Sequence, residues 1–309
     1  MTEAAPLLSL RLFVDYRNKA GVLRDVFMEI GQGEILGLVG QSGSGKSTLS
    51  LAILRLLHLK GGTARGNLLF KGEDLFAKTE TEMRSLRGRE MSIVLQSPLT
   101  SLNPVLRIGS QLSEAWRAHA DGTRGDCAAA ICTALANVSL PNDSDFLRRR
   151  PSQLSLGQAQ RVIIAMAILH RPSLLIADEA TSALDTITQS EILRLFAQLN
   201  RELGMGILYI SHDLLSVAAL CHRIAILNEG EIVECGPPSQ IFGAPQQSYT
   251  QKLVSALPRR PCFDSDGDKL GSVAVDGDSL THDPVARKRF EGDHELPRHT
   301  VAASSRRED

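Results

Sequence analysis

The segment GQSGSGKS at residues 40–47 constrains the fold more than any other part of the sequence. It fills every fixed position of the pattern G-x-x-x-x-G-K-[ST] and directly follows the apolar run Ile35–Val39. From the end of this motif onward, residues 47–57 place apolar side chains at helical spacing. A buried strand, a glycine-rich loop and a helix in this order form the β-loop-α unit of a parallel sheet. The sequence therefore predicts a P-loop NTPase core that binds a nucleoside triphosphate.

Each residue type in this loop has a physical role toward a phosphate chain. Glycines let backbone N–H groups surround the phosphates, and the helix N-terminus adds positive potential. Lys46 is expected to reach the β and γ phosphates, and the Ser47 hydroxyl to ligate Mg²⁺. A glycine-rich surface turn is the alternative, but the flanking strand and helix disfavour it. We expect nucleotide contacts from Gly40, Ser42, Gly43, Ser44, Gly45, Lys46, Ser47 and Thr48.

A second apolar strand, predicted at residues 174–177, is followed by the carboxylates Asp178 and Glu179. Ligands of α/β sheets bind at the carboxyl ends of the strands. Alone, this acidic pair would be equally consistent with a solvated strand end. With the phosphate loop upstream, we expect Asp178 to hold Mg²⁺ directly or through water, and Glu179 to polarise the water that attacks the γ-phosphate.

Alternating β and α patterns along the rest of the chain favour an α/β fold. Residues 8–16 and 22–30, broken at 18–21, predict an antiparallel β subdomain at the N-terminal end. A strand is expected at residues 207–210, and a hairpin at 224–236 with its turn at 228–230. Residues 97–160 favour an inserted α-helical subdomain. One helical face is predicted from Ile192, Leu195, Phe196, Leu199 and Leu203.

Composition narrows the class of protein. The net charge is −1, which indicates neither a basic nucleic-acid binder nor an acidic solvating protein. No run is apolar and long enough to predict a membrane span, and no signal peptide is expected. We expect an ATPase domain over residues 8–258 and a polar, disordered tail over 259–309.

Metal and disulfide chemistry is not predicted elsewhere in the chain. The five cysteines include no C-x-x-C pair, so neither a disulfide framework nor a zinc site is expected. The run at Asp264, Asp266 and Asp268 resembles the start of a calcium loop. Lys269 and Val275 stand where that loop needs Gly and a bidentate Glu, so no calcium site is expected.

The segment Leu154-Ser155-Leu156-Gly157-Gln158 resembles the L-S-G-G-Q signature of the ATP-binding-cassette (ABC) ATPases. It precedes the acidic strand, as it does in that family. The remaining family motifs follow in the expected order. They are Tyr16 for the aromatic that stacks on adenine, Gln96 for the Q-loop, residues 182–185 with Asp185 for the D-loop, and His212 for the switch histidine.

This resemblance implies ATP and Mg²⁺ as ligands and ATP hydrolysis as the reaction. It implies catalytic roles for Glu179, His212 and Gln96, and Mg²⁺ contacts for Ser47, Gln96 and Asp178. It also implies a dimer in which one subunit's signature completes the ATP site of the other. The residues implied in that role are Ser155, Gly157, Gln158 and Asp185.

The sequence SPLTSLNP at residues 97–104 narrows the resemblance to the ATPases of peptide and nickel importers. Residues 231–258 are similar to the end of that subfamily's domain, although Gln247 and Ser248 stand where members often have His-Pro. The implied partners are a second ATPase subunit, identical or different, and two integral-membrane permeases. An extracytoplasmic substrate-binding protein would act indirectly, and no nucleic acid is implied. The implied location is the cytoplasmic face of the inner membrane.

Two residues depart from the family pattern. Leu156 replaces the first glycine of the signature, where a Cβ can obstruct close backbone approach to a phosphate. Ala180 replaces the proline that usually follows the catalytic glutamate. Some relatives carry an iron–sulfur cysteine cluster after the domain, but only Cys262 stands there, so none is expected.

Two other classes of protein remain as alternatives. A soluble ABC ATPase of DNA repair or translation usually has long coiled-coil insertions or two cassettes in one chain, and neither is present here. A P-loop kinase or GTPase would lack the signature and the switch histidine.

Overall fold

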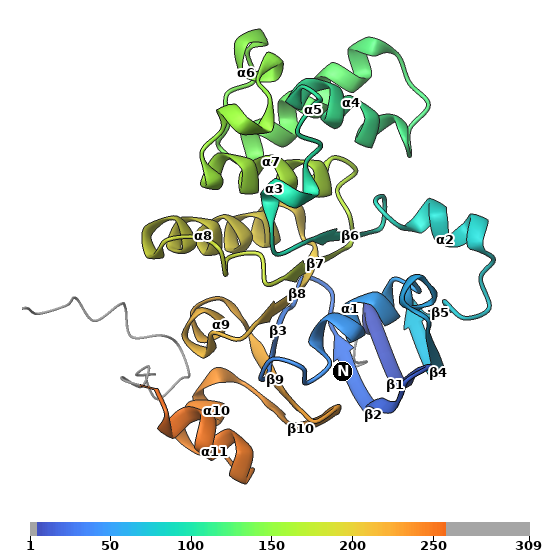
Figure 1. Ribbon diagram of the computed structural model, residues 1–309, viewed down its shortest axis with the longest axis vertical. Helices are drawn as coiled ribbons and strands as arrows, with labels where there is room; N and C mark the ends of the chain where they lie inside the picture. The colour runs from blue at the N-terminus through green and yellow to red at the C-terminus, as the bar shows by residue number, and fades with distance from the viewer. Residues whose placement is uncertain (1–4, 258–309) are drawn as a thin grey trace, which may run out of the picture. The chain divides into compact units, whose positions relative to one another are not determined.

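The computed structural model describes residues 5–257 (Figure 1). The expected disordered tail, Cys262 and the acidic run beginning at Asp264 lie outside the described residues.

A six-stranded sheet forms the centre, with the strand order β10-β9-β3-β8-β7-β6. Neighbouring strands from β9 to β6 pair in parallel, and β10 pairs with β9 in antiparallel fashion. The bounds are β3 (Ile35–Val39), β6 (Met91–Val94), β7 (Leu174–Asp178), β8 (Gly206–Ser211), β9 (Arg223–Asn228) and β10 (Glu231–Gly236). The predicted hairpin is thus β9 and β10. Every residue of β3, β7 and β8 is buried, which explains their continuous apolar sequences.

A separate antiparallel sheet has the order β2-β1-β4-β5. Its strands are β1 (Leu8–Tyr16), β2 (Lys19–Ile30), β4 (Gly62–Phe70) and β5 (Glu73–Asp74). Strand β2 begins at Lys19, earlier than the sequence pattern predicted, because Tyr16 pairs with Lys19 across a tight turn. Gly21 has a φ of 64° and lies where the β1–β2 register shifts. It therefore belongs to a bulge inside the hairpin and not to the turn.

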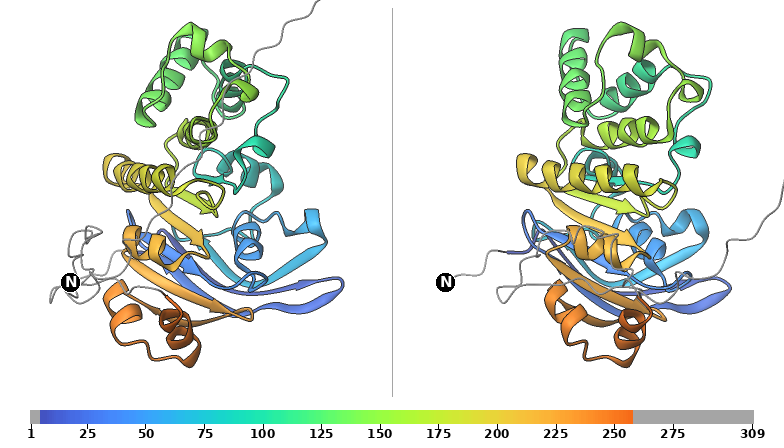
Figure 2. Two further views of the ribbon diagram at one scale, coloured as in Figure 1. Left: turned by 60° about the vertical axis from the view of Figure 1, so that its left-hand side comes forward. Right: turned by 90° about the vertical axis from the view of Figure 1, so that its left-hand side faces the viewer.

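Helices connect and cover the sheets (Figures 1 and 2). The P-loop leads into α1 (Lys46–Ile53), which is shorter than the pattern over residues 47–57 predicted and is followed by the 3₁₀ turn η1 (Leu57–Lys60). Between β6 and β7 the chain forms α3 (Pro98–Ser101), α4 (Ile108–Arg117), α5 (Arg124–Asn137), α6 (Ser144–Arg148), η2 (Pro151–Gln153) and α7 (Leu156–Ile168). The other helices are α2 (Glu80–Leu86), α8 (Thr186–Leu203), α9 (Leu214–Leu220), α10 (Pro238–Gly243) and α11 (Ser248–Ser255). The predicted α/β architecture with an antiparallel β subdomain and inserted helices is confirmed.

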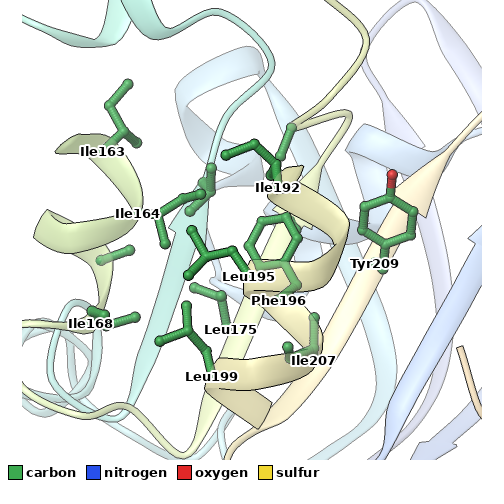
Figure 3. Packing of buried hydrophobic residues seen from close by; sticks show 14 of the residues in the cluster. Ile163, Ile164, Ile168, Leu175, Ile192, Leu195, Phe196, Leu199, Ile207 and Tyr209 are labelled. Carbon is green, nitrogen blue, oxygen red and sulfur yellow. The ribbon is translucent and has the colours of Figure 1, made fainter. Parts of the chain in front are cut away.

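Each face of the six-stranded sheet has its own hydrophobic core. Alternate residues of β3 belong to different cores, with Ile35 and Val39 on one side and Leu36 and Leu38 on the other. Figure 3 shows the first core, where α7 and α8 pack over β7 and β8. The predicted face of α8 is buried at Ile192, Leu195, Phe196 and Leu199, and Leu203 is half-buried.

Truncation of Phe196 tests this core. Phe196 is fully buried and its ring centroid lies 6.2 Å from that of Tyr209. Phe196→Ala should lower the free energy of unfolding by about 3–5 kcal/mol, because it removes buried apolar surface and leaves a cavity. Urea unfolding of the full-length chain would measure this.

Phe27→Ala is the matched control, because Phe27 is 56% exposed on β2. We expect it to change stability by less than about 0.5 kcal/mol. Equal losses from both substitutions would contradict the described core.

Candidate functional site

Four loops leave the same edge of the central sheet, because β3, β6, β7 and β8 run in parallel. The phosphate loop follows β3, Gln96 follows β6, Glu179 follows β7 and His212 follows β8. The topology therefore places residues from distant parts of the sequence around one site.

The phosphate loop is held in place by the β9–β10 hairpin. A Cβ built on Gly40 would lie 2.2 Å from the carbonyl oxygen of Leu227, so only glycine fits there. The Gly230 N–H donates to the carbonyl of Ser44 at 3.1 Å. Gly45 has a φ of 113° and caps α1, a conformation that residues with a Cβ rarely adopt. The hydroxyl of Ser44 is buried and has no hydrogen-bond partner among the described residues.

Lys46 is a buried cation at the first position of α1, with 6% of its surface exposed. Its Nζ donates to the carbonyls of Gly40 at 2.7 Å and Gln41 at 3.1 Å. Glu179 Oε1 lies 4.0 Å from Nζ. Burial lowers the pKa of Lys46, and the neighbouring carboxylates Glu179 and Asp178 oppose that shift. An ammonium with two of its three donors used keeps one for an anionic ligand.

Asp178 ends β7 and is 7% exposed. Its carboxylate accepts from Ser47 Oγ at 3.4 Å and from Ser50 Oγ at 3.3 Å. Burial raises the pKa of Asp178, and these two hydroxyl groups only partly oppose the shift. A buried carboxylate beside a serine hydroxyl provides the hard oxygen ligands that Mg²⁺ prefers, so the residues present fit this ion. No cluster of three or more His, Cys, Asp or Glu side chains suited to a metal occurs in residues 5–257. A cation here would therefore need phosphate or water oxygens as further ligands.

Glu179 adopts an uncommon backbone conformation, with a φ of 50°. Its N–H donates to the carbonyl of Ile210 at 2.9 Å, which ties the residue after β7 to strand β8. His212 Nδ1 lies 3.5 Å from Glu179 Oε1, and the two side chains are 59% and 21% exposed. Local strain at a carboxylate placed between a lysine and a histidine is typical of a functional position.

The structure brings some predicted residues to this site and shows no hydrogen bond or ion pair to it, within residues 5–257, for others. The Tyr16 hydroxyl lies 3.5 Å from Thr48 Oγ1, at the edge of the phosphate loop. Gln96 is exposed beyond the end of β6. Ser155 caps α7 and Asp185 caps α8, and these helix ends meet where Gly157 faces Thr188. No hydrogen bond or ion pair described for residues 5–257 joins residues 155–158 to the phosphate loop, Asp178 or Glu179.

Sequence reasoning missed Ser50. Its hydroxyl is buried and contacts Asp178, although it lies outside the P-loop pattern. The available signal was its spacing, because position 50 follows Lys46 by one helical turn and so lies on the same side of α1.

Residues 23–182 match the sequence profile of the family described as ABC transporter. The chain belongs to the ABC transporter family. The match covers both the phosphate loop and the acidic end of β7, so the sequence-based assignment to the ABC family is confirmed.

Relatives and solved structures of the ABC family agree with this assignment. A glutathione import ATP-binding protein, GsiA of Shigella dysenteriae serotype 1 (strain Sd197), is 40% identical over 253 residues, which cover 80% of this chain and 41% of that protein. GsiA of Pectobacterium atrosepticum is 41% identical over 252 residues, 80% of this chain and 40% of the relative. The chain thus spans less than half the length of these relatives.

Two solved structures show the same fold at 25% sequence identity. One is cbiO1 from Clostridium perfringens, described as part of the ABC transporter complex cbiONQ, with a TM-score of 0.68 over 83% of this chain and 97% of the other. The second is the dimeric ATP-binding cassette MJ0796 in a post-hydrolysis state with ADP and Pi. Its TM-score is 0.63, and the match covers 74% of this chain and 98% of the other. Within residues 5–257, no helix combines the length and the apolar character needed to cross a membrane.

Substitution of Asp178 should stabilise the nucleotide-free protein. The pKa of Asp178 lies above its ordinary value of 3.8 in the folded protein. The free energy of unfolding therefore falls as pH rises from 3.8 to the native pKa. At any higher pH the full loss of stability persists. Asp178→Asn should therefore raise the free energy of unfolding at pH 8 by about 1 kcal/mol, and the gain should shrink toward pH 4. Thermal unfolding across this pH range would measure it.

Asp126→Asn is the control, because the pKa of Asp126 is shifted in the opposite direction to that of Asp178. Hydrogen bonds from Thr123 lower the pKa of Asp126 at the cap of α5. The ionised Asp126 carboxylate therefore adds to the free energy of unfolding at neutral pH, and this stabilisation is lost on acidification. Asp126→Asn should not stabilise the protein. A loss of stability at pH 8 for Asp178→Asn would contradict the effect of burial.

Proposed function

We propose that this chain is the ATP-hydrolysing subunit of an ABC importer whose solute is a peptide or peptide-like compound, or nickel. The observation that carries the proposal is the set formed by the buried Lys46 and Asp178 and the half-buried Glu179, which meets at the carboxyl edge of β3 and β7. Two carboxylates and a lysine in such a site suit Mg²⁺-dependent phosphoryl transfer to water.

In this proposal the phosphate loop binds ATP. Backbone N–H groups of residues 40–48 and the start of α1 contact the phosphates, and the remaining donor of Lys46 neutralises the β and γ oxygens. Tyr16, at the end of β1, contacts the adenine. Ser47, Asp178 and Gln96 would hold Mg²⁺, which would supply charge neutralisation at the phosphates. The buried hydroxyl of Ser44 provides one further donor inside the loop.

Glu179 acts on the attacking water. Its carboxylate is held between Lys46 and His212 by the backbone bond from Glu179 to β8. We assign His212 and Gln96 to the γ-phosphate region, where they orient the water and stabilise developing charge. Preorganised positive groups of this kind supply most of the catalysis of phosphoryl transfer.

The separation of the signature from the phosphate loop within one chain supports a dimeric mechanism. Ser155, Gly157, Gln158 and Asp185 would complete the ATP site of a second ATPase subunit, identical or different. The dimeric state of the MJ0796 structure is consistent with this arrangement.

Exposed apolar residues near the inserted helices support docking on membrane subunits. Leu95, Leu99 and Val105 are 47%, 53% and 70% exposed, and they lie between the end of β6 and the start of α4. Their position next to Gln96 suits a surface that transmits closure of the ATP site to two permease subunits. The chain would then act at the cytoplasmic face of the inner membrane, and an extracytoplasmic binding protein would deliver the solute to the permeases.

The relatives named for glutathione import favour a peptide-like solute, because glutathione is itself a peptide. Solute choice depends on the permeases and the binding protein, which are other chains. Co-purification of the full-length chain with its membrane subunits, followed by solute-stimulated ATP turnover in proteoliposomes, would test the importer assignment directly. Stimulation by DNA or ribosomes and not by a captured solute would favour the soluble alternative.

Two substitutions should separate binding from hydrolysis. Glu179→Gln should reduce the turnover number at least about 100-fold while ATP still binds, because the amide cannot activate water. Lys46→Ala should weaken ATP binding, because it removes the buried cation. The measurements are ATP turnover and equilibrium binding of a fluorescent ATP analogue to the full-length chain. Wild-type turnover in Glu179→Gln would refute the assignment.

Leu156 should slow ATP hydrolysis at the site that its signature segment completes. It is half-buried as the first residue of α7 and puts a side chain where the family has glycine. If the chain pairs with itself, Leu156→Gly should raise turnover by about tenfold, the equivalent of about 1.4 kcal/mol in the barrier. If it pairs with a cassette of intact signature, the main site contains this chain's Glu179 and turnover should change little. Turnover of the assembled transporter measures both cases.

Inactivation of each cassette in turn provides the control for Leu156. Should Glu179→Gln leave turnover intact while the equivalent change in a different partner abolishes it, the proposed placement of the main site is reversed.

A further inference from the structure

A cluster of buried hydroxyl groups is formed by residues close in sequence to Glu179 and His212. Tyr209 is fully buried in the centre of β8, and Thr181, Ser211 and Ser216 are 3%, 4% and 4% exposed. The Tyr209 oxygen lies 2.9 Å from Thr181 Oγ1 and 3.4 Å from Ser216 Oγ. Figure 3 shows the Tyr209 ring near Phe196, so the ring packs in the apolar core while its hydroxyl meets the polar groups.

The hydrogen bonds of this cluster form a connected series. Ser216 Oγ donates to the carbonyl of Asp213 at 2.8 Å, and Tyr209 donates to Ser216. In the bond between Thr181 and Tyr209 either oxygen can be the donor. Burial raises the pKa of Tyr209, which keeps its proton in place at neutral pH. The result is a series of hydrogen bonds that links Thr181 through Tyr209 and Ser216 to the backbone of Asp213.

The two ends of this series belong to the two loops that meet at the site. Thr181 follows Glu179 by two residues, and the loop between them is closed by a bond from Ser182 N–H to the Glu179 carbonyl at 3.2 Å. Asp213 follows His212 directly, and its N–H donates to Ser211 Oγ at 3.0 Å. His212 is thus flanked by two residues that belong to the same cluster.

A second link fixes Asp213 from the other side. Its carboxylate accepts from Gln189 on α8 at 3.1 Å and from the Leu215 N–H at 3.0 Å, where it caps α9. The backbone around His212 is therefore held from β8, α8 and α9. Tyr209 is the member of this set that also reaches the loop of Glu179.

We infer that Tyr209 is a positioning residue for ATP hydrolysis, which sets the placement of His212 relative to Glu179 through the chain Thr181–Tyr209–Ser216. The inference rests on the proposed function, because it assigns Glu179 and His212 to the reacting centre. The role of Tyr209 is to hold the two side chains 3.5 Å apart while nucleotide binding depends on the separate phosphate loop.

Removal of the Tyr209 hydroxyl tests this role. Tyr209→Phe keeps the buried ring and deletes one bond donor and acceptor. We expect kcat for ATP to fall about tenfold and KM to change less than about twofold, because a kcat loss without a KM change reports an interaction that matters only in the reaction. Thr181→Val, which removes the other partner, should have a similar effect. The double variant should be no slower than the slower single variant, because both delete the same link.

The control is Tyr249→Phe, which deletes a buried tyrosine hydroxyl without a hydrogen-bond partner in residues 5–257. It should leave kcat and KM unchanged. Amide hydrogen exchange of the full-length chain provides a measurement independent of turnover. Exchange at residues 212–216 should accelerate in Tyr209→Phe and Thr181→Val but not in Tyr249→Phe, while exchange at residues 40–48 stays unchanged.

Several results would overturn the inference. They are an unchanged kcat for Tyr209→Phe, a rise in KM alone, multiplicative losses in the double variant, or unchanged exchange at residues 212–216. Glu179→Gln distinguishes this failure from failure of the proposed function. If Glu179→Gln abolishes turnover and Tyr209→Phe has no effect, only the role of Tyr209 is wrong. If Glu179→Gln retains turnover, the catalytic assignment itself fails.

Discussion

Burial of charge at the edge of the central sheet is the constraint on which the site depends. Lys46 and Asp178 are both nearly inaccessible to solvent, and desolvation disfavours the charged form of each. The fold compensates with carbonyl acceptors for the lysine and serine donors for the aspartate. These bonds offset only part of the cost. The site is therefore a local loss of stability that the apolar cores on both faces of the sheet must outweigh.

Burial on both faces of the central sheet explains why some strands could be predicted from sequence and others could not. Strands β3, β7 and β8 are buried on both faces, so their continuous apolar runs were unambiguous. Strand β4 has five consecutive exposed or half-buried residues, Thr63 to Asn67, and contains two glycines, and β6 has only four residues, so neither pattern was strong enough to predict. The start of β2 was misplaced because Asn18 and Gly21 resemble a turn, whereas Gly21 forms a bulge.

The candidate site was predictable to a similar extent. Residues within a local motif, such as Lys46 and Ser47, could be assigned because loop and helix geometry fix their spacing. The proximity of Glu179 and His212 required strand order, which no local pattern encodes. Ser50 and Tyr209 were missed for a related reason. A serine in a helix and a tyrosine in a strand are common residues whose partners lie on other elements.

The β9–β10 hairpin has a consequence for biosynthesis. The bond from Gly230 to Ser44 and the close approach of Leu227 to Gly40 mean that the phosphate loop rests on a segment translated long after it. When the phosphate loop, the inserted helices and β7 have been synthesised, Leu227 and Gly230, which contact the loop, have not. The nascent chain therefore acquires its nucleotide pocket only near the end of domain synthesis, when strand β9 joins the sheet beside β3.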